Sequence, residues 1–390
     1  MATNTLYLVM GIDIGSSTTK VVIKPAYTGD DNFFVVDFGE YGQPDATYLL
    51  PTQLCLGEKP HTYFVPNRNQ VPDFKDIKYK FMEGDKEAGV QLSAFIAWVI
   101  KYSRDYFMRT YYENDVFKGK EIDWSINMGI PSAEFSQNGD EKWLPLLEKA
   151  CEIHVDNSMN IDISKGVSSR ITDDLHVIPE IIATIKSLVE QDGANNDGLY
   201  CAVDVGATTL DVCTFRIFDS DNAQKYAFYK SSVKSFGVAR YNEAVDKEKF
   251  LDECDKQLRS VIFGTYLYKT RRESEWGRGL PVILCGGGSY VHEYKELLDN
   301  LAMTVLKDVA VYEFHNSNYT GFKYIKMPEN HYVYENKVDK NRLLVAQGLS
   351  YPYNDFDEIQ RVYCECESDN MPVITIHDRS VNEYVSQEMC

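Results

Sequence analysis

The segment GIDIGSSTTK, residues 11–20, carries the backbone and side chains that suit phosphate binding. It follows the apolar run of residues 6–10, so Asp13 stands near the end of an expected strand. The turn after that strand consists of Gly15, Ser16, Ser17 and Thr18. A turn rich in glycine and hydroxyl residues exposes N–H and O–H donors, which are the groups that hold a phosphate. The segment therefore predicts a phosphate-binding turn between two strands.

A second segment, LYCAVDVGATTLDVCTF at residues 199–215, repeats this design. When its Asp204 is aligned with Asp13, the glycine and the two hydroxyl residues of the turn align as well. In the second segment these residues are Gly206, Thr208 and Thr209. The two copies lie about 190 residues apart. The sequence therefore predicts a chain built of two similar halves.

The composition is that of a globular protein with a strong negative charge. The chain has 390 residues and a mass of 44.7 kDa, with 44% hydrophobic and 25% charged residues, which is enough for two domains with cores of their own. Its formal net charge of -19 repels nucleic acid and anionic membrane surfaces, so neither is expected as a partner. A nucleotide stays compatible, because a local nest of N–H groups with a metal ion binds phosphate within an acidic protein.

The N-terminus and the cysteines favour a cytoplasmic protein. No basic segment with an apolar core opens the chain, and no apolar run reaches the roughly 18 residues of a membrane span. The nine cysteines are scattered and odd in number, which indicates reduced thiols. A zinc site is the alternative for one group of residues, although their spacing fits no common template. These residues are Cys364, Cys366, His377 and Cys390.

Hydrophobic periodicity and turn residues predict the elements of the first half. We expect strands at residues 6–10, 20–24, 33–38, 123–130, 160–163 and 168–172, and helices at residues 84–112, 141–153 and 177–190. Residues 39–85 are rich in Pro, Gly, Asn and Asp, and so predict an irregular inserted lobe. The run DGANNDG at residues 192–198 is the clearest linker, and it marks the expected boundary between two domains.

The second half is expected to follow the same plan. A strand is predicted at residues 226–233, a long helix at 249–269, and a buried strand within 280–291 that ends in Gly286, Gly287 and Gly288. Residues 309–341 predict a strand pair with an insertion, and residues 371–376 predict a strand in the acidic tail. We thus expect a first domain at 1–192, a second domain at 193–345 with a short inserted lobe at 237–280, and a connecting helix with the tail at 346–390.

These motifs together resemble those of the actin, sugar-kinase and DnaK-chaperone ATPase superfamily. Five signatures occur in the superfamily's order: GIDIGSSTTK, VIPEIIATIK, AVDVGATTLDV, VILCGGGSYV and VAQGLSY. The resemblance covers about residues 5–352. It implies an α/β fold, the actin-like ATPase fold, in which two similar ribonuclease-H-like domains enclose a nucleotide cleft.

The resemblance also implies roles for single residues. Asp13 and Asp204 would hold the waters of a Mg²⁺ ion on the phosphates of ATP or ADP. Lys20 resembles the phosphate-contacting lysine of actins and sugar kinases, which DnaK chaperones lack. The other cofactor-binding positions would lie along the phosphates, the ribose and the adenine: Gly15, Ser16, Ser17, Thr18, Gly206, Thr208, Thr209, Gly286, Gly287 and Gly288.

Two further carboxylates are assigned to catalysis by the same resemblance. Glu180 falls where DnaK-type chaperones carry a catalytic Glu, although its order with Pro179 is reversed in this chain. Asp211 matches the second Asp of the chaperone loop, and Lys78 faintly resembles a catalytic chaperone lysine. Structural alternatives exist for the candidates: the aspartates as turn residues, Lys20 as a solvated strand residue, and Glu180 as an acid in the first turn of a helix.

Three functions are compatible with this superfamily. The main one is an ATP-binding switch of the actin or DnaK type that hydrolyses ATP to ADP and phosphate and lacks a peptide-binding domain, since about 40 residues follow the second connecting helix. The alternative is a polymerising filament protein of the plasmid-segregation or cytoskeletal type, which Lys20 favours. A small-molecule kinase is the third. The expected partners are the nucleotide and either further copies of the chain in a filament or an unknown protein.

Overall fold

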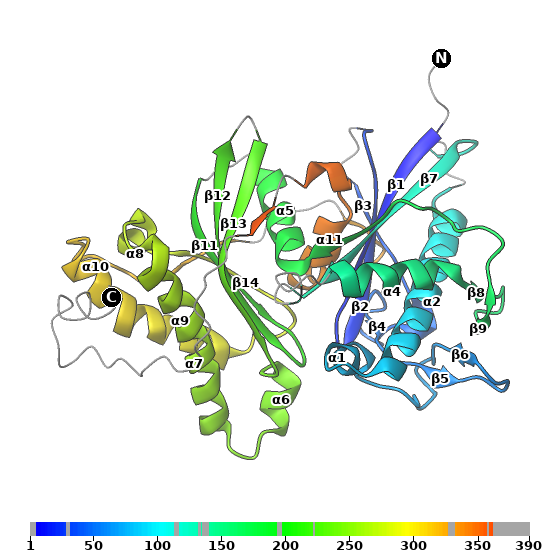
Figure 1. The fold of residues 1–390 in the computed structure, drawn as a ribbon, viewed down its shortest axis with the longest axis horizontal. Coiled ribbons are helices and arrows are strands. Elements are labelled where there is room, and N and C mark those ends of the chain that lie inside the picture. The colour runs from blue at the N-terminus through cyan, green and yellow to red at the C-terminus, as the bar shows by residue number, and fades with distance from the viewer. Residues whose placement is uncertain are drawn as a thin grey trace.

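The structure of the protein is a computed structural model. It describes residues 5–28, 32–112, 117–131, 134, 140–192, 197–220, 223–326, 332–356 and 359–361. Within these residues the chain forms two main sheets with helices packed on them and a smaller third sheet (Figure 1). Among the described helices, none combines the length and the apolar character needed to cross a membrane.

The first main sheet begins with the hairpin of β1 (Thr5–Ile14) and β2 (Thr18–Pro25). Its remaining strands are β3 (Phe33–Val35), β4 (Leu50–Pro51), β7 (Glu121–Ile130), β10 (Leu175–Pro179) and β16 (Tyr332–Val333). The order is β10-β7-β1-β2-β3-β16, and β4 pairs with β2. Strands β1, β2 and β3 form an antiparallel meander, while β7 runs parallel to β1 and β10 runs parallel to β7.

The second main sheet repeats this order. Its strands are β11 (Gly198–Val205), β12 (Leu210–Ser220), β13 (Ala223–Lys234), β14 (Pro281–Cys285), β15 (Lys323–Tyr324) and β17 (Ile359–Arg361). The order is β15-β14-β11-β12-β13-β17, again with an antiparallel meander and two parallel strands beside its first strand. The two sheets therefore share the strand order that defines a ribonuclease-H-like domain, and the predicted α/β fold class is confirmed.

The third sheet is small and combines two distant segments. It consists of β5 (Cys55–Leu56), β6 (Thr62–Phe64), β9 (Ile161–Gly166) and β8 (Ile153–Val155), in that order. The lobe predicted at residues 39–85 contains β4, β5, β6 and helix α1, but it pairs through β6 with β9 from much later in the chain. The strand predicted at residues 168–172 is wrong, because that segment is irregular.

The described helices of the first half include α1 (Ile77–Met82), α2 (Lys86–Thr110), α4 (Asp140–Glu152) and α5 (Glu180–Asp192). Helices α2 and α4 share a core with the first sheet, whereas the buried residues of α5 pack with those of β11 and β12 in the second sheet. Asp85 is the N-cap of helix α2, and its side chain accepts hydrogen bonds from the backbone N–H groups of Glu87 and Ala88. Phe95 and Trp98 of this helix are fully buried and belong to the core of this half.

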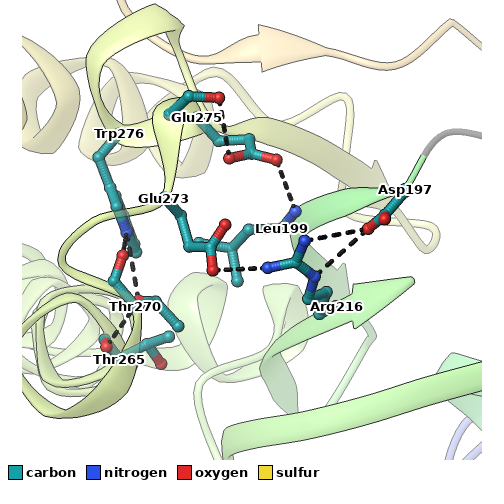
Figure 2. Close-up of polar contacts among 9 residues, drawn as sticks. Asp197, Leu199, Arg216, Thr265, Thr270, Glu273, Glu275 and Trp276 are labelled. Atoms are coloured by element: carbon teal, nitrogen blue, oxygen red, sulfur yellow. Dashed lines mark hydrogen bonds and ion pairs between the residues drawn. The ribbon is translucent and has the colours of Figure 1, made fainter. Parts of the chain in front are cut away.

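Helices of the second half are α6 (Val238–Glu243), α7 (Lys247–Thr265), α8 (Ser274–Arg278), α9 (His292–Leu301) and α10 (Lys307–Tyr312). Figure 2 shows how the segment around α8 is fastened to the sheet. Arg216 on β12 pairs with Asp197 at 3.1 Å and with Glu273 at 2.5 Å. The indole N–H of Trp276 donates to the Thr270 carbonyl at 2.8 Å. These contacts fix the connection from α7 to β14. They therefore also help to position β14, the strand that the three glycines follow.

Helix α11 (Lys340–Leu349) packs between the two halves, against α5 and against β1 and β2. The close packing needs glycine. A Cβ atom on Gly348 would lie 1.7 Å from the Ala183 carbonyl oxygen of α5, and one on Gly11 would lie 2.3 Å from the Ala346 carbonyl oxygen. Helices α5 and α11, which carry the VIPEIIATIK and VAQGLSY signatures, are thus in direct contact at the centre of the molecule (Figure 1).

Several sequence predictions need correction. The helix expected at 177–190 starts at Glu180, because residues 175–179 form β10. The strand pair expected at 309–341 does not form: residues 307–312 are helical, and β15 and β16 join different main sheets. The strand expected at 371–376 lies outside the described residues, as do Cys364, Cys366, His377 and Cys390. The six described cysteines are buried free thiols.

Candidate functional site

A cavity of about 320 Å³ lies where the two main sheets approach each other. It receives residues from β1, β2, α1 and α5 on one side, and from β11, β12, α6, the segment after β14 and the start of α11 on the other. Every site residue that the sequence predicted lines it: Asp13, Gly15, Ser16, Ser17, Thr18, Lys20, Glu180, Asp204, Gly206, Thr208, Thr209, Asp211, Gly286, Gly287 and Gly288. Residues far apart in sequence thus meet in a single cavity.

The first hairpin presents a tight turn to this cavity. The N–H of Gly15 donates to the Thr18 carbonyl at 3.1 Å, which closes the turn around Ser16 and Ser17. A Cβ atom on residue 15 would lie 2.5 Å from that carbonyl, so the turn requires glycine. Thr52 holds the turn from outside, because its hydroxyl donates to the Gly15 carbonyl at 2.7 Å.

Asp13 and Lys20 face each other across the first hairpin. They are directly opposite in the antiparallel register, and Lys20 Nζ lies 2.8 Å from Asp13 Oδ2. Their side chains are only 8% and 14% exposed, so the pair is largely shielded from water. The solvated alternative for Lys20 is therefore wrong, since its ammonium group pairs with Asp13 at the wall of the cavity.

The second hairpin has the same turn but a different charge pair. The N–H of Gly206 donates to the Thr209 carbonyl at 2.9 Å. Across the hairpin Asp204 stands opposite Asp211, so two carboxylates occupy the positions that Asp13 and Lys20 occupy in the first copy. The start of α6 closes over this turn, with the N–H of Ala239 donating to the Ala207 carbonyl at 2.7 Å.

The surroundings of Asp204 disfavour its charged form. Burial, together with the nearby carboxylates of Glu180 and Asp13, raises the pKa of Asp204 to about 7, although Lys20 and Lys78 act in the opposite direction. A carboxylate that is desolvated among other carboxylates is stabilised by a cation. The charges at this end of the cavity therefore favour a positive ion between the two hairpins.

Glycines allow the backbone to approach at the end of β14. Gly286 has a φ of +82°, and a Cβ atom there would lie 2.1 Å from Asp204 Oδ1. The N–H of Gly288 donates to the Val205 carbonyl at 2.8 Å, which joins this segment to the second hairpin. No larger residue fits beside Asp204 at this point, so the wall of the cavity here is bare backbone.

Glu180 is the first residue of α5, and it enters the cavity beside Lys78 of α1. Lys78 Nζ lies 2.6 Å from Glu180 Oε1, and the two side chains are only 4% and 16% exposed. Pro179 is the last residue of β10 and Glu180 is the first residue of α5. Their order, which is reversed relative to the chaperone motif, thus coincides with the junction of strand and helix. Lys78, which the sequence indicated only faintly, thus holds this carboxylate in place.

The sequence did not indicate some residues of the cavity. Asn341 and Arg342 at the start of α11 line it, and so does Asn242 at the end of α6. Arg342 lies beside the glycines, with its Nε 3.2 Å from where a Cβ atom of Gly287 would be. The first two residues lie four and three positions before Val345, where the VAQGLSY signature begins, and this signature was the one available sign of them.

Comparisons with known proteins give similarity at the level of structure. No protein-family model matches the chain, and no curated protein matches it either. The chain is similar to a ParM filament structure from Clostridium botulinum, with 13% identity, 88% of this chain and 98% of that chain covered, and a TM-score of 0.46. It is similar to the archaeal actin homologue Ta0583, with 14% identity, coverage of 88% and 98%, and a TM-score of 0.44.

A third similarity is to the ethanolamine utilization protein EutJ from Carboxydothermus hydrogenoformans, with 11% identity, coverage of 88% and 89%, and a TM-score of 0.37. One structure of Ta0583 is a complex with ADP. Within this chain itself, the repeated strand order of the two sheets and the cavity where they meet agree with the resemblance stated from the five signatures. The described residues thus form two sheets of ribonuclease-H-like strand order with a cavity where they meet, which is the arrangement expected of the actin-like ATPase fold.

Proposed function

We propose that this protein binds ATP in the cavity between its two sheets and hydrolyses it to ADP and phosphate. The observation that carries the proposal is the pair of hairpins, which direct the same glycine turn and the same strand-end aspartate into one cavity. N–H groups of both turns would hold the phosphates from two sides. The glycines after β14 would let ribose and adenine approach the backbone.

The donors at the cavity fit a magnesium ion. Asp13, Asp204 and the hydroxyls of Thr208 and Thr209 supply oxygen atoms, which Mg²⁺ prefers together with waters and phosphate oxygens. When bound, the ion would neutralise charge on the phosphates during transfer. Asp13 and Asp204 would hold its waters, and Lys20 would add a positive charge at the first hairpin.

Glu180 is the candidate that positions the attacking water. Phosphoryl transfer to water needs an oriented nucleophile and charge stabilisation rather than a covalent intermediate. Lys78 pairs with Glu180 and fixes its direction by the 2.6 Å contact. A carboxylate oriented in this way accepts a hydrogen bond from the water that attacks the γ-phosphate. Asp211 adds a second acceptor near the same end of the cavity.

The experiment compares phosphate release by the purified chain and by two variants, Asp13→Ala and Asp204→Ala. We expect each variant to lose hydrolysis while remaining folded by circular dichroism. The matched control is Asp252→Ala on the exposed side of α7, which removes a carboxylate away from the cavity. Normal turnover in both site variants would contradict the assignment.

Assembly into filaments is a second candidate, and Lys20 is the observation that favours it over a DnaK-like switch. The lysine that resembles those of actins stands in the cavity and pairs with Asp13, at a position where DnaK chaperones lack lysine. One of the similar structures is a ParM filament. We therefore propose that the ATP-bound chain associates with further copies of itself.

Light scattering and pelleting after addition of ATP test this second proposal. A polymer that grows with protein concentration and disappears with ADP is the expected result. ATP hydrolysis without any polymer would favour a monomeric switch instead. ATP consumption that starts only when a small-molecule acceptor is added would favour a kinase.

A further inference from the structure

A second cavity, of about 310 Å³, lies at the end of the first sheet where strands β1, β7 and β10 begin. It is lined at the start of β1 by Tyr7, whereas the nucleotide candidate site begins at Asp13 near the end of the same strand. Tyr7 and Asp13 are six residues apart on an extended strand, which corresponds to about 20 Å. Because the strands β7 and β10 run parallel to β1 and begin at the same end of the sheet, residues 123 and 176 also reach this cavity. The two cavities are therefore separate sites.

The two cavities differ in their charged residues. The first is lined by the cations Lys20, Lys78 and Arg342 together with the carboxylates of Asp13, Glu180, Asp204 and Asp211. The described residues around the second include the carboxylates of Asp123 and Asp174 but no lysine or arginine. In a chain with a net charge of -19, these carboxylates lie in a negative field that attracts cations.

Aromatic rings form the rest of the wall. Tyr7, Tyr27 and Tyr353 are 44%, 71% and 46% exposed, an unusual grouping of large rings at a cavity. Tyr7 and Tyr27 meet edge to face with ring centroids 6.2 Å apart. Tyr353 stacks flat on His176 at 3.8 Å, and Asp174 Oδ1 lies 2.7 Å from His176 Nε2, which fixes both rings. The faces of such rings attract organic cations.

One polar group in this wall lacks a hydrogen bond. Ser125 Oγ is buried and makes no hydrogen bond within the described part of the chain, although its residue lines the cavity. Buried hydroxyls are nearly always satisfied by protein, water or ligand. Ser125 lies two residues after Asp123 on β7, so both side chains are on the same face of the sheet.

We propose that this cavity, which the tyrosines Tyr7, Tyr27 and Tyr353 and the carboxylates Asp123 and Asp174 line, binds an organic cation with a guanidinium or primary ammonium head. The carboxylates receive the N–H donors of the head, and the rings pack on its flat face or on its alkyl chain. The ligand is either a free small amine or the side chain of an arginine or lysine in another protein. The site is independent of the nucleotide site.

The test is a titration of the full-length protein with Nα-acetylarginine amide, followed by calorimetry and by saturation-transfer NMR. The neutral isostere Nα-acetylcitrulline amide has the same shape without the charge, and n-butylguanidinium has the same head and the same single charge without peptide groups. We expect the arginine derivative or butylguanidinium to bind and the citrulline derivative not to bind. Tighter binding of butylguanidinium identifies a small free cation as the ligand, and tighter binding of the arginine derivative identifies a protein side chain.

Variants localise the binding. Asp123→Asn should weaken it about twofold to fivefold, as expected for an ion pair at a partly exposed site. Tyr353→Leu should weaken it by a similar factor through loss of the cation–π contact. Asp252→Asn on α7 is the control and should leave it unchanged, and all three variants should keep the melting temperature and the ATP affinity of the parent. Equal binding of arginine and citrulline derivatives, or binding that is the same in Asp123→Asn and the parent, would overturn the proposal.

Discussion

The two hairpins have the same turn geometry but bring different charges to the cavity. In both, the glycine N–H donates to the carbonyl of the residue three positions later, at 3.1 Å in the first and 2.9 Å in the second. In both, the aspartate stands opposite the residue seven positions later. That residue is Lys20 in the first hairpin and Asp211 in the second. The turn geometry is thus shared, while the charge that each hairpin brings to the cavity differs.

This difference indicates a division of roles. The first hairpin neutralises its aspartate internally through the 2.8 Å contact of Lys20 with Asp13. The second hairpin places two carboxylates opposite each other, and the pKa of Asp204 is raised to about 7. Burial and the carboxylates of Glu180 and Asp13 cause this rise, and a cation beside Asp204 would offset it; in our proposal that cation is the Mg²⁺ that arrives with the nucleotide.

Giving the first hairpin the charges of the second should have the largest effect. Lys20→Asp would leave Asp13 facing another carboxylate at a position where both side chains are mostly buried. We expect the free energy of unfolding to fall by about 3–5 kcal/mol, the usual effect of breaking a buried ion pair. Chemical denaturation without divalent ions measures it. Lys20→Gln removes the charge without adding a carboxylate and should be less destabilised; equal losses in the two variants would argue against the electrostatic account.

A substitution at Gly286 tests whether the second hairpin needs bare backbone beside it. Gly286→Ala imposes a side chain at a φ of +82° and 2.1 Å from Asp204 Oδ1. Gly84→Ala is the matched control, since Gly84 has a φ of +91° and a Cβ atom there would have no neighbour within 4 Å. We expect Gly286→Ala to be less stable than the control by about 1–3 kcal/mol, owing to the clash. Equal melting temperatures of the two variants would contradict this packing.

Removing the like-charge pair should have the smallest effect. Asp211→Asn relieves the repulsion across the second hairpin, so the free energy of unfolding without divalent ions should rise by about 0.2–1 kcal/mol. The same variant should gain less stability from added Mg²⁺ than the parent. Thermal unfolding with and without Mg²⁺ measures both. A variant less stable than the parent without Mg²⁺ would show that Asp211 has a structural role in the hairpin.

The sequence predicted the hairpins well because each is a local motif. Seven-residue spacing from Asp13 to Lys20, and from Asp204 to Asp211, determines which residues face each other once the glycine turn forms. The repeat of the motif also predicted two similar halves, which the shared strand order confirms. The limits proposed for the two domains stay a prediction, and β16, which falls in the range given to the second domain, pairs with β3 of the first sheet.

Contacts between distant residues were beyond the sequence. Lys78 and Glu180 are 102 positions apart, and nothing local in either segment indicates that α1 meets the start of α5. The periodicity predicts a helix from residue 177, three residues before α5 begins, because the apolar residues at the end of β10 continue the apolar face of α5. Arg342 reaches the first cavity, and the tyrosines reach the second, only through the fold.

The central claim is that both hairpins act on one bound nucleotide, and a double-mutant cycle tests it most directly. The measurement is the dissociation constant of Mg–ATP for the parent, Asp13→Asn, Asp204→Asn and the double variant. If the two aspartates share one ion, the double variant should lose less affinity than the product of the single losses, with a coupling of about 0.5–3 kcal/mol. Losses that multiply without coupling would contradict the claim, because the two hairpins would then bind independently.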